Sequence, residues 1–208
     1  MFNKDGFIEI GDEIFVYKHF MSDEECESIM KDILSLREEV WIEPLLTTTK
    51  DYFISEKQTE SIKAVKKRIA SILLDGCYAT PGGRASKLLK GASRRPHSDI
   101  DQFKEVWYEA GIYKEGDEFD LADLITYGTI IYFNDFEGGE VYYPEQNNLQ
   151  YKPEKGDLVI HSAEQKCKHG VGEVLSDVRY FSVGHFFKHV KVSKGHNFRK
   201  TPLENLRG

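Results

Sequence analysis

The sequence predicts an α+β protein in which helices come first and a β-sheet core follows. Two observations carry this prediction. Two stretches before residue 76 place apolar residues at helical spacing, and the chain beyond it consists of short apolar and aromatic runs separated by glycine, proline and aspartate. We therefore expect a single domain over 1–208, with a helical part over 1–76, a β core over 77–190 and a tail over 191–208.

Both helices are predicted from a capping signature followed by an apolar stripe. Ser22 and Glu25 have the spacing of a capping box, and Ser55 and Gln58 repeat it. Gly76 is expected to end the second helix. The apolar residues that follow the two signatures at helical spacing are Cys26, Ile29, Met30, Ile33 and Leu34 in the first helix, and Ile62, Val65, Ile69, Ile72 and Leu73 in the second.

Strands are predicted where β-branched and aromatic residues gather between turn residues. The runs are 125–133, 141–143, 158–160 and 178–187, and the turns between them are Gly138-Gly139 and 153–156. Short strands with regular turns indicate a sandwich or barrel. The polar segment 100–123 carries Trp107, Tyr108 and Tyr113. It is either a mobile flap over a substrate or a short helix packed on the barrel, and the sequence leaves both open.

Composition narrows the class of function. The chain has 28 basic and 35 acidic residues, a formal charge of −7, which disfavours a nucleic-acid partner. Its three cysteines are widely spaced and form no CxxC pair, so we expect a reducing, cytoplasmic location. The acidic first twenty residues do not resemble a signal peptide, and no apolar run is long enough to span a bilayer, so no membrane role is expected.

The chemistry centres on three separated residues. His97 and Asp99 form an HxD triplet. Alone it is weak evidence, because the chain has 35 acidic residues and seven histidines, and such a triplet is expected to occur by chance. On an extended strand, residues two apart face the same side, so this imidazole and carboxylate can meet one metal ion. His169, beside Gly170, is the best third ligand. Two histidines and one carboxylate leave adjacent coordination positions open, which suits Fe(II) and oxygen.

Arg179 lies ten residues beyond His169 on the next predicted strand. A guanidinium there can hold a carboxylate through a paired, charge-assisted contact. The alternative is an ordinary surface salt bridge. His161 is expected to pack in the core, and no ligand role is expected for His185. A zinc site built on Cys167 and His169 has no second pair of ligands to support it.

From about Lys87 to Phe187 the sequence resembles the Fe(II)/2-oxoglutarate dioxygenases, particularly the prolyl 4-hydroxylase-like branch. The motifs occur jointly and in the order of that family. They read Gly91, His97-Ser98-Asp99, Tyr132-Phe133-Asn134-Asp135, Gly138-Gly139-Glu140, Pro153-Glu154-Lys155-Gly156, His169-Gly170-Val171 and Arg179. The resemblance implies a double-stranded β-helix, a jelly-roll barrel supported by the N-terminal helices.

The same resemblance implies the ligands and the reaction. Fe(II) would be held by His97, Asp99 and His169, and 2-oxoglutarate would chelate the iron with its far carboxylate on Arg179. Reaction with O2 would release succinate and CO2 and hydroxylate a C–H bond of a peptide, a protein or a small molecule. Ascorbate would support turnover. Oligomeric state is not predicted.

Two departures from the family pattern matter. Leu88 stands nine residues before His97, where a tyrosine often contacts 2-oxoglutarate, so Tyr127 or Tyr132 is expected to serve instead. Prolyl hydroxylases usually have lysine at the position of Arg179, which weakens the assignment to prolyl substrates. A free amino acid or small metabolite, and a non-catalytic barrel that binds without iron, remain alternatives. A nucleic-acid demethylase is disfavoured because His185 stands where that branch has a second arginine.

Overall fold

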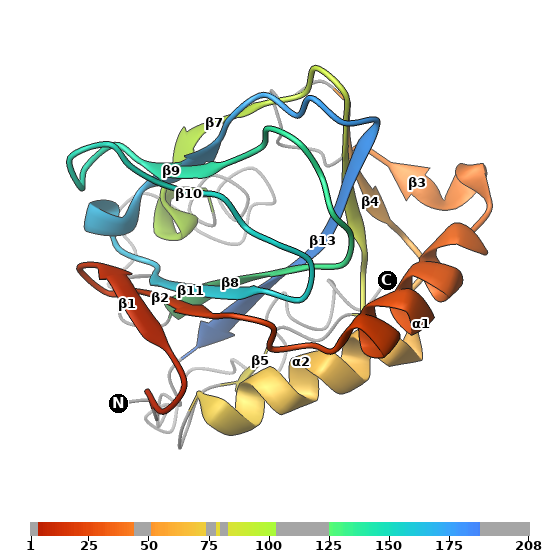
Figure 1. Cartoon of the computed structure of the whole chain (residues 1–208), viewed down its shortest axis with the longest axis horizontal. Coiled ribbons are helices and arrows are strands. Elements are labelled where there is room, and N and C mark those ends of the chain that lie inside the picture. The colour runs from red at the N-terminus through yellow and green to blue at the C-terminus, as the bar shows by residue number, and fades with distance from the viewer. Residues whose placement is uncertain (1–3, 44–50, 74–77, 80–82, 103–124, 188–208) are drawn as a thin grey trace, which may run out of the picture.

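The computed structural model describes residues 4–43, 51–73, 78–79, 83–102 and 125–187. Its described part has two helices on one side of a large sheet and a smaller sheet facing the other side (Figure 1). The predicted α+β class and the jelly-roll barrel are confirmed. No helix in these ranges is long and apolar enough to cross a membrane.

The large sheet contains nine strands among the described residues, in the order β1-β2-β11-β8-β13-β6-β4-β3, with β5 also paired to β13. All of its pairings are antiparallel. The strands are β1 (Ile8–Gly11), β2 (Ile14–Tyr17), β3 (Trp41–Ile42), β4 (Tyr52–Ser55), β5 (Tyr78–Ala79), β6 (Ser86–Leu89), β8 (Ile125–Tyr132), β11 (Leu158–Ser162) and β13 (Val178–Phe187).

The smaller sheet has the described strands β10 (Leu149–Tyr151), β9 (Val141–Tyr143), β12 (His169–Val171) and β7 (Arg94–His97), in that order. Of two short 3-10 helices, η1 (Glu38–Val40) lies between the first helix and β3, and η3 (Gln165–Cys167) lies between β11 and β12. Gly138 and Gly139 both have positive φ, 66° and 63°, which explains why the predicted turn needs glycine at both positions. The predicted runs 141–143 and 178–187 agree with β9 and β13.

Helix α1 (Asp23–Leu34) begins as predicted, because Ser22 and Glu25 form a reciprocal capping box. Helix α2 (Glu60–Ile72) begins later than predicted. Ser55 ends strand β4, and Thr59 is the N-cap, its side chain accepting from the amide of Ile62. The expected end at Gly76 lies outside the described residues. Arg68 joins the two helices through its ion pair with Glu25 at 2.6 Å.

Residues 1–76 are not purely helical, contrary to expectation. Strands β1 to β4 belong to this region and join the large sheet at both of its ends. Strands this short carry little periodicity of their own. β2 pairs with β11 and β4 with β6, and β1 and β3 extend the sheet by pairing with β2 and β4. The domain therefore closes by bringing its N-terminal strands onto strands from the second half of the chain.

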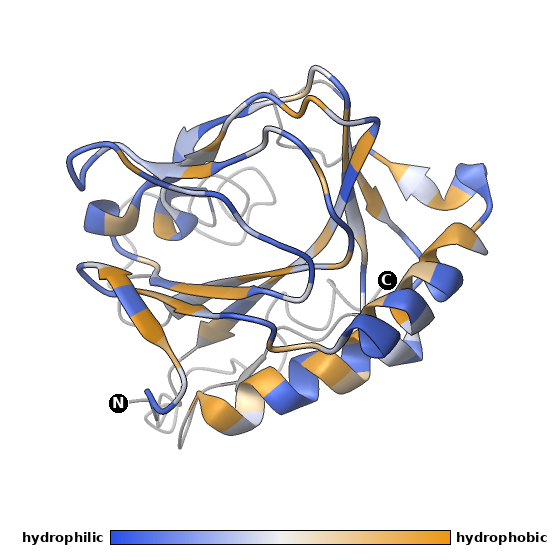
Figure 2. Ribbon diagram, in the orientation of Figure 1, coloured by the Kyte–Doolittle hydropathy of each residue, from blue (hydrophilic) through white to orange (hydrophobic). Residues whose placement is uncertain are grey.

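Side chains on the two faces of the large sheet form two separate clusters. On one face Ile131 and Ile160 pack with Ile29 and Ile62 of the helices, and on the other Ile130 and Val159 line the space between the sheets. Figure 2 shows hydrophobic and hydrophilic bands alternating along α1 and α2, as expected of helices that place one face on a sheet. Because neighbouring strand residues face opposite sides, residues 126–132 of β8, 158–162 of β11 and 178–186 of β13 can be assigned to the helix side or the barrel interior.

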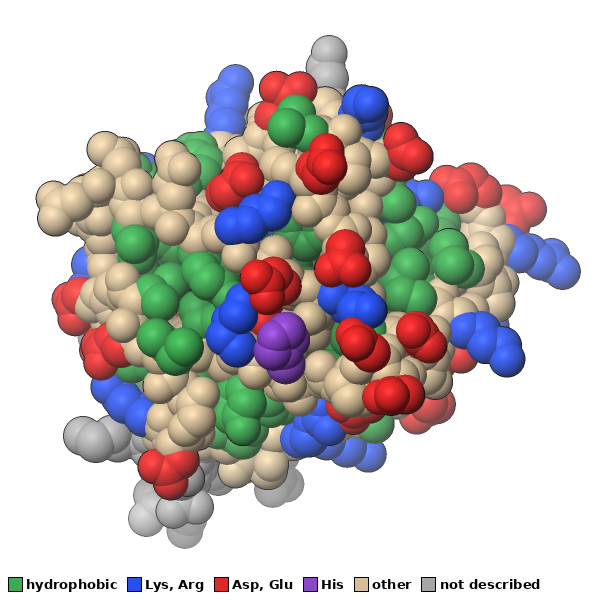
Figure 3. Space-filling view, in the orientation of Figure 1, with side chains coloured by type: hydrophobic (Ala, Val, Ile, Leu, Met, Phe, Trp, Pro, Cys, Tyr) green, Lys and Arg blue, Asp and Glu red, His purple; other side chains and the backbone are tan. Residues whose placement is uncertain are grey.

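Figure 3 shows one face of the molecule, where acidic and basic side chains alternate around small apolar groups. This face presents no extended basic surface of the kind that nucleic-acid binding requires. Inside the barrel, charged groups of both signs are buried, namely Arg179 and Asp99.

Lys66 is a buried charge on the helix side of the sheet. Its ammonium donates to the carbonyl oxygen of Val183 on β13 at 2.7 Å. Burial lowers the pKa of Lys66 to about 8, and the Arg84 charge acts in the same direction. The fold therefore favours the neutral amine. Between that pKa and the ordinary value of 10.5 the unfolded chain binds a proton that the folded chain does not, so stability from this group rises with pH.

We predict that Lys66→Met removes this pH dependence. From pH 7 to pH 10 the wild type should gain about 2–3 kcal/mol of unfolding free energy relative to Lys66→Met, measured by urea unfolding. The matched control is Lys67→Met on the same helix, where the lysine is exposed and no such gain is expected. A constant difference between wild type and Lys66→Met over this range would contradict the assignment.

Candidate metal centre

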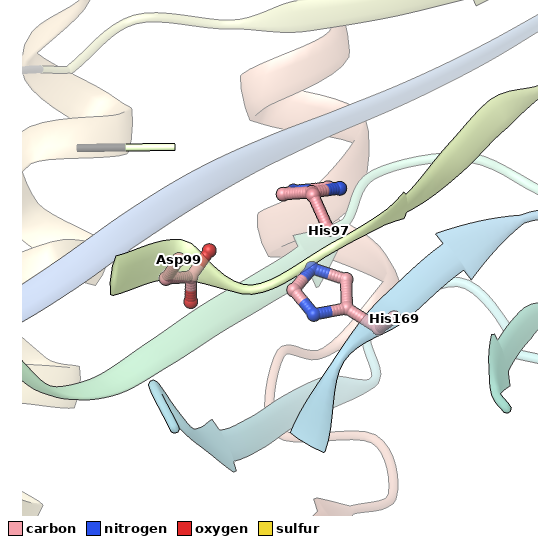
Figure 4. Close-up of side chains that lie close together, drawn as sticks. All are labelled: His97, Asp99 and His169. Atoms are coloured by element: carbon pink, nitrogen blue, oxygen red, sulfur yellow. The ribbon is translucent and has the colours of Figure 1, made fainter. Parts of the chain in front are cut away.

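Strand pairing brings the predicted ligands together. In the β7–β12 ladder His97 is the direct partner of His169, and their ring centroids are 4.6 Å apart. Asp99 follows β7 by two residues. One potential ligand atom from each of His97, Asp99 and His169 lies within 4.8 Å of the others, as expected of residues around one ion (Figure 4).

Asp99 reaches this position by a route that the sequence did not predict. The extended strand ends at His97, and residues 99–102 are helical. Ser98 acts as the N-cap, since its hydroxyl accepts from the amide of Asp101 at 3.2 Å and its carbonyl accepts from the amide of Gln102 at 3.1 Å. The turn from strand into helix, rather than a shared strand face, therefore directs the carboxylate toward the two imidazoles.

Backbone carbonyls orient both imidazoles. His97 Nδ1 lies 3.2 Å from the carbonyl oxygen of Arg95, and His169 Nδ1 lies 3.2 Å from that of Cys167. A carbonyl oxygen only accepts, so Nδ1 carries the hydrogen in each ring and Nε2 has the free lone pair. Both rings therefore present Nε2 as a ligand atom.

The charge states also suit a cation. Burial lowers the pKa of His97 to about 4, with the Arg94 charge acting in the same direction. Burial also holds the pKa of His169 well below its usual range, assisted by the imidazoles of His161 and His97. Both rings are thus neutral near pH 7, as metal ligation requires.

Asp99 is buried, with 3% of its surface exposed, and both of its oxygens contact further histidines. His161 Nε2 lies 3.3 Å from Oδ2, and His185 Nε2 lies 3.3 Å from Oδ1. Burial alone would raise the pKa of the Asp99 carboxyl, but the His185 and His161 imidazoles outweigh it and hold the pKa well below its usual range. The carboxylate is therefore charged and fixed in orientation.

A buried tyrosine extends this arrangement. The hydroxyl of Tyr143 lies 3.2 Å from Nδ1 of His161. Burial raises the pKa of Tyr143 well above its ordinary value, so its hydroxyl keeps its proton and donates to Nδ1. Nε2 of His161 then carries the ring hydrogen and donates to Asp99. Tyr143, His161 and Asp99 thus form a hydrogen-bonded series in which each group fixes the next.

The sequence predicts that His161 packs in the core, and it gives no indication of a ligand role for His185. The packing expectation for His161 was incomplete, because both rings contact the Asp99 carboxylate. The position of His185 in the barrel interior could have been predicted from its spacing to Arg179. His185 and Arg179 are six residues apart on one strand, so they share a face, and that face is the barrel interior.

Arg179 lies deeper on the same interior surface, on β13 between β8 and β6. It is fully buried, and its guanidinium carbon is 4.8–5.2 Å from the ring centroids of Tyr132, Phe136 and Phe181. Nη2 donates to the hydroxyl oxygen of Tyr132 at 3.2 Å. Nε and Nη1 have no hydrogen-bond partner among the described residues. A buried guanidinium with free donors is costly, so this pocket suits an incoming anion.

The structure separates the two tyrosines considered for the co-substrate. Tyr132 is buried beside Arg179, and burial raises its pKa to about 12 despite the nearby Arg179 charge, so its hydroxyl stays protonated. Tyr127 packs against the helix-side cluster on the other face of the sheet. Leu88 is fully buried and pairs across strands with Arg179. The structure therefore places Tyr132 beside Arg179 and leaves Tyr127 away from it.

A second group of possible ligands, His19, Glu154 and Asp157, lies near the surface. The ammonium of Lys18 is 2.9 Å from carboxylate oxygens of both Glu154 and Asp157, and Tyr151 donates to Asp157 at 2.6 Å. The Lys18 ammonium therefore already neutralises the two carboxylates that a metal ion would need. Cys167 contacts the carbonyl oxygen of Asp12 at 3.4 Å, a contact that gives no support to zinc binding with His169.

Solved structures with similar folds are consistent with this geometry. A viral collagen prolyl hydroxylase from Paramecium bursaria Chlorella virus-1 in complex with 2-oxoglutarate matches with a TM-score of 0.58 at 17% identity, over 87% of this chain and 98% of that one. A prolyl hydroxylase from Trichoplax adhaerens, in complex with a hypoxia inducible factor peptide, matches with a TM-score of 0.63 at 14% identity, over 88% of each chain. The chain has the fold of the 2OG-Fe(II) oxygenases.

A third similar structure has a different kind of ligand. HygX from Streptomyces hygroscopicus, with nickel, 2-oxoglutarate and hygromycin B bound, matches with a TM-score of 0.61 at 12% identity, over 93% of this chain and 87% of that one. No family sequence model matches the chain, and no curated protein sequence matches it significantly. The fold is therefore shared by one protein whose structure holds a peptide and by another whose structure holds the small molecule hygromycin B.

Gly128 on β8 makes room for the Asp99 carboxylate. A Cβ atom at this position would lie 2.5 Å from His161 Nε2 and closer still to Asp99 Oδ2. We predict that Gly128→Ala displaces Asp99 and weakens Co(II) binding by about 10–100-fold, the usual scale for disturbing groups around metal ligands. Anaerobic titration of the Co(II) visible absorption measures this.

The matched control is Gly172→Ala, where the nearest heavy atom to an added Cβ is Glu140 Oε2 at 3.3 Å. This variant should bind Co(II) like the wild type. Equal affinity in Gly128→Ala and wild type would show that the close packing around Asp99 is not needed to hold the ion.

Proposed function

We propose that this protein is an Fe(II)- and 2-oxoglutarate-dependent oxygenase that hydroxylates a C–H bond. The observation that carries the proposal is the joint presence, on one interior surface, of three convergent metal ligands and a buried arginine with free donors. A metal site alone occurs in many folds. A buried guanidinium with free N–H donors, at a second position in the same interior, is what an anionic co-substrate requires.

His97 Nε2, His169 Nε2 and Asp99 hold the ion in the proposal. These three ligands leave further coordination positions for a chelating co-substrate and for oxygen. When bound, iron with 2-oxoglutarate and O2 supplies the oxidant, and succinate and CO2 are released. The chain's own task is to fix geometry and keep water out, which the burial of Asp99, His161 and His169 accomplishes.

Arg179 and Tyr132 receive the far carboxylate of 2-oxoglutarate. A free N–H of Arg179, at Nε or at Nη1, supplies one donor, and the hydroxyl hydrogen of Tyr132 supplies a second, because the oxygen of that hydroxyl already accepts from Nη2. Tyr132 thus replaces the tyrosine that is absent at Leu88. Apolar walls strengthen these contacts by excluding water.

The primary substrate is a peptide or protein residue, or alternatively a free amino acid or small metabolite. Similar folds occur in structures that hold a hypoxia inducible factor peptide and hygromycin B, so the fold does not choose between these classes. A non-catalytic barrel is the weaker alternative, since a binding module has no need of the complete ligand set. Ascorbate belongs in the assay as a supporting reductant.

The iron ligands are tested by His169→Ala. We expect Fe(II) affinity, measured by anaerobic titration, to fall by more than the roughly 100-fold that loss of an outer contact can cause. Consumption of 2-oxoglutarate should also be abolished, with little change in circular dichroism. The control is His19→Asn, which replaces the exposed histidine of the group formed by His19, Glu154 and Asp157. Asparagine is chosen because it tolerates the positive φ of 51° at this position. Full Fe(II) affinity in His169→Ala would reject the centre.

The co-substrate pocket is tested by Arg179→Ala. We expect the KM for 2-oxoglutarate to rise by about 10–100-fold or more, the scale of losing a charge-assisted pair. Arg179→Lys should lose less, because it keeps the charge without the fork of donors. Tyr132→Phe should raise KM about 5-fold, the scale of one hydrogen bond. An unchanged KM in Arg179→Ala, with Fe(II) binding intact, would reject this role for the arginine.

A further inference from the structure

A second arginine lies beside the metal centre and has no part in the proposed chemistry. Arg94 is on β7, three residues before His97, and pairs with Val171 in the ladder that joins His97 to His169. The register shifts between His169 and Val171, so the regular alternation of side chains is interrupted there. As a result Arg94 and His97 both contact interior residues, namely Tyr52 and His169.

The two arginines flank one aromatic pair. The rings of Tyr52 and Phe181 are stacked, 6.1 Å apart and inclined by 13°. The Arg94 guanidinium carbon is 5.2 Å from the Tyr52 ring centroid, and that of Arg179 is 4.8 Å from the Phe181 ring centroid. Each guanidinium thus lies within cation–π distance of one ring of the pair, and its remaining N–H groups can bind a planar anion.

The two arginines differ in depth. Arg179 is fully buried, whereas Arg94 is partly exposed. A co-substrate held on Arg179 therefore occupies the deep end, and a molecule that enters after it lies on the outer side, where Arg94 is. In the proposed reaction, the buried Arg179 thus lies where the co-substrate binds, and the partly exposed Arg94 lies where the primary substrate enters.

Arg94 also has no counter-ion among the residues that the structure describes. Its side chain makes one hydrogen bond to a described residue, from Nη2 to the amide oxygen of Gln102 at 3.1 Å, and no carboxylate in the described ranges is within ion-pairing distance. Gln102 belongs to the helical segment that begins with Asp99. The neutral amide holds the guanidinium in place without neutralising it, so the positive charge remains available.

We propose that Arg94 receives a carboxylate of the primary substrate, so that the enzyme selects acids that carry this group close to the C–H bond that is oxidised. The inference rests on the proposed oxygenase function and adds the substrate class. A planar guanidinium fork pairs with a carboxylate through two parallel hydrogen bonds. The carboxylate belongs either to a free amino or carboxylic acid, or to an acidic side chain or C-terminus of a peptide.

The test compares Arg94→Gln with wild type, with Arg37→Gln as an exposed arginine control. The probes are the twenty free L-amino acids, small mono- and dicarboxylic acids, acidic peptides, and the amide and methyl ester of each acid. The first readout is 2-oxoglutarate consumption with and without each probe, with mass spectrometry for a gain of one oxygen. The second is the unfolding midpoint of the anaerobic Co(II)- and 2-oxoglutarate-loaded protein with each probe.

We expect at least one carboxylate to accelerate 2-oxoglutarate consumption by the wild type and to raise its unfolding midpoint, while its amide and ester do neither. Arg94→Gln should raise the KM for that acid about 10–100-fold and leave the KM for 2-oxoglutarate within about twofold. Arg94→Lys should recover part of the loss. Acceleration by free acids or by acidic peptides identifies the source of the carboxylate.

The inference is overturned if no carboxylate accelerates the wild type, if amides and esters act equally well, or if Arg94→Gln responds to the acid as Arg37→Gln does. A raised KM for 2-oxoglutarate in Arg94→Gln would also overturn it, since Arg94 would then serve the co-substrate. Failure of the oxygenase proposal is distinct. In that case the wild type with Fe(II) consumes no 2-oxoglutarate under any condition.

Discussion

The buried Asp99 carboxylate is the group on which the rest of the centre depends. A charge removed from water is tolerated only when its oxygens are well paired, and here His161 and His185 each contact one oxygen. This requirement explains three neighbouring features together. Ser98 caps the turn that directs Asp99 inward, Gly128 leaves room beneath the carboxylate, and Tyr143 fixes the tautomer of His161. His97 and His169 then complete a site for a cation.

The second constraint is unpaired positive charge on the same interior surface. Within the described part of the chain, Arg179 has free donors in an aromatic pocket, and Arg94, nearer the outside, has only a neutral acceptor. Together with a dication at the three ligands, the barrel interior would be strongly cationic. It is suited to two anionic molecules, one deep and one outer, although the chain as a whole has a formal charge of −7.

Much of this could be read from the sequence, because the signals were local. The capping box at Ser22 and the run 178–187 reflect short-range chemistry, and both agree with the structure. The start of α2 was misplaced because Ser55 and Gln58 imitate a capping box, whereas Ser55 ends a strand. Strands β1 to β4 were missed because β2 and β4 depend on partners more than 30 residues away, and β1 and β3 join the sheet only by pairing with β2 and β4.

The centre was only partly predictable for the same reason. His97, Asp99, His169 and Arg179 are candidates that the spacing and order of motifs predict, but the turn at Ser98 and the contacts of His161 with Asp99 need the tertiary fold. Sequence spacing could not show that β8 turns Tyr127 to the helix side and Tyr132 to the interior until the register was known. The flap predicted for 100–123, with Trp107, Tyr108 and Tyr113, lies largely outside the described residues and stays a prediction.

The most direct test of the central claim is a crystal structure of the protein grown anaerobically with Fe(II) and 2-oxoglutarate, with anomalous data collected at the iron edge. The account predicts one iron peak, about 2.0–2.2 Å from His97 Nε2, His169 Nε2 and an Asp99 oxygen. The far carboxylate of 2-oxoglutarate should lie within hydrogen-bond distance of Arg179 Nε or Nη1 and of the Tyr132 hydroxyl. An iron peak at His19, Glu154 and Asp157 instead, or a co-substrate that does not reach Arg179, would contradict the account.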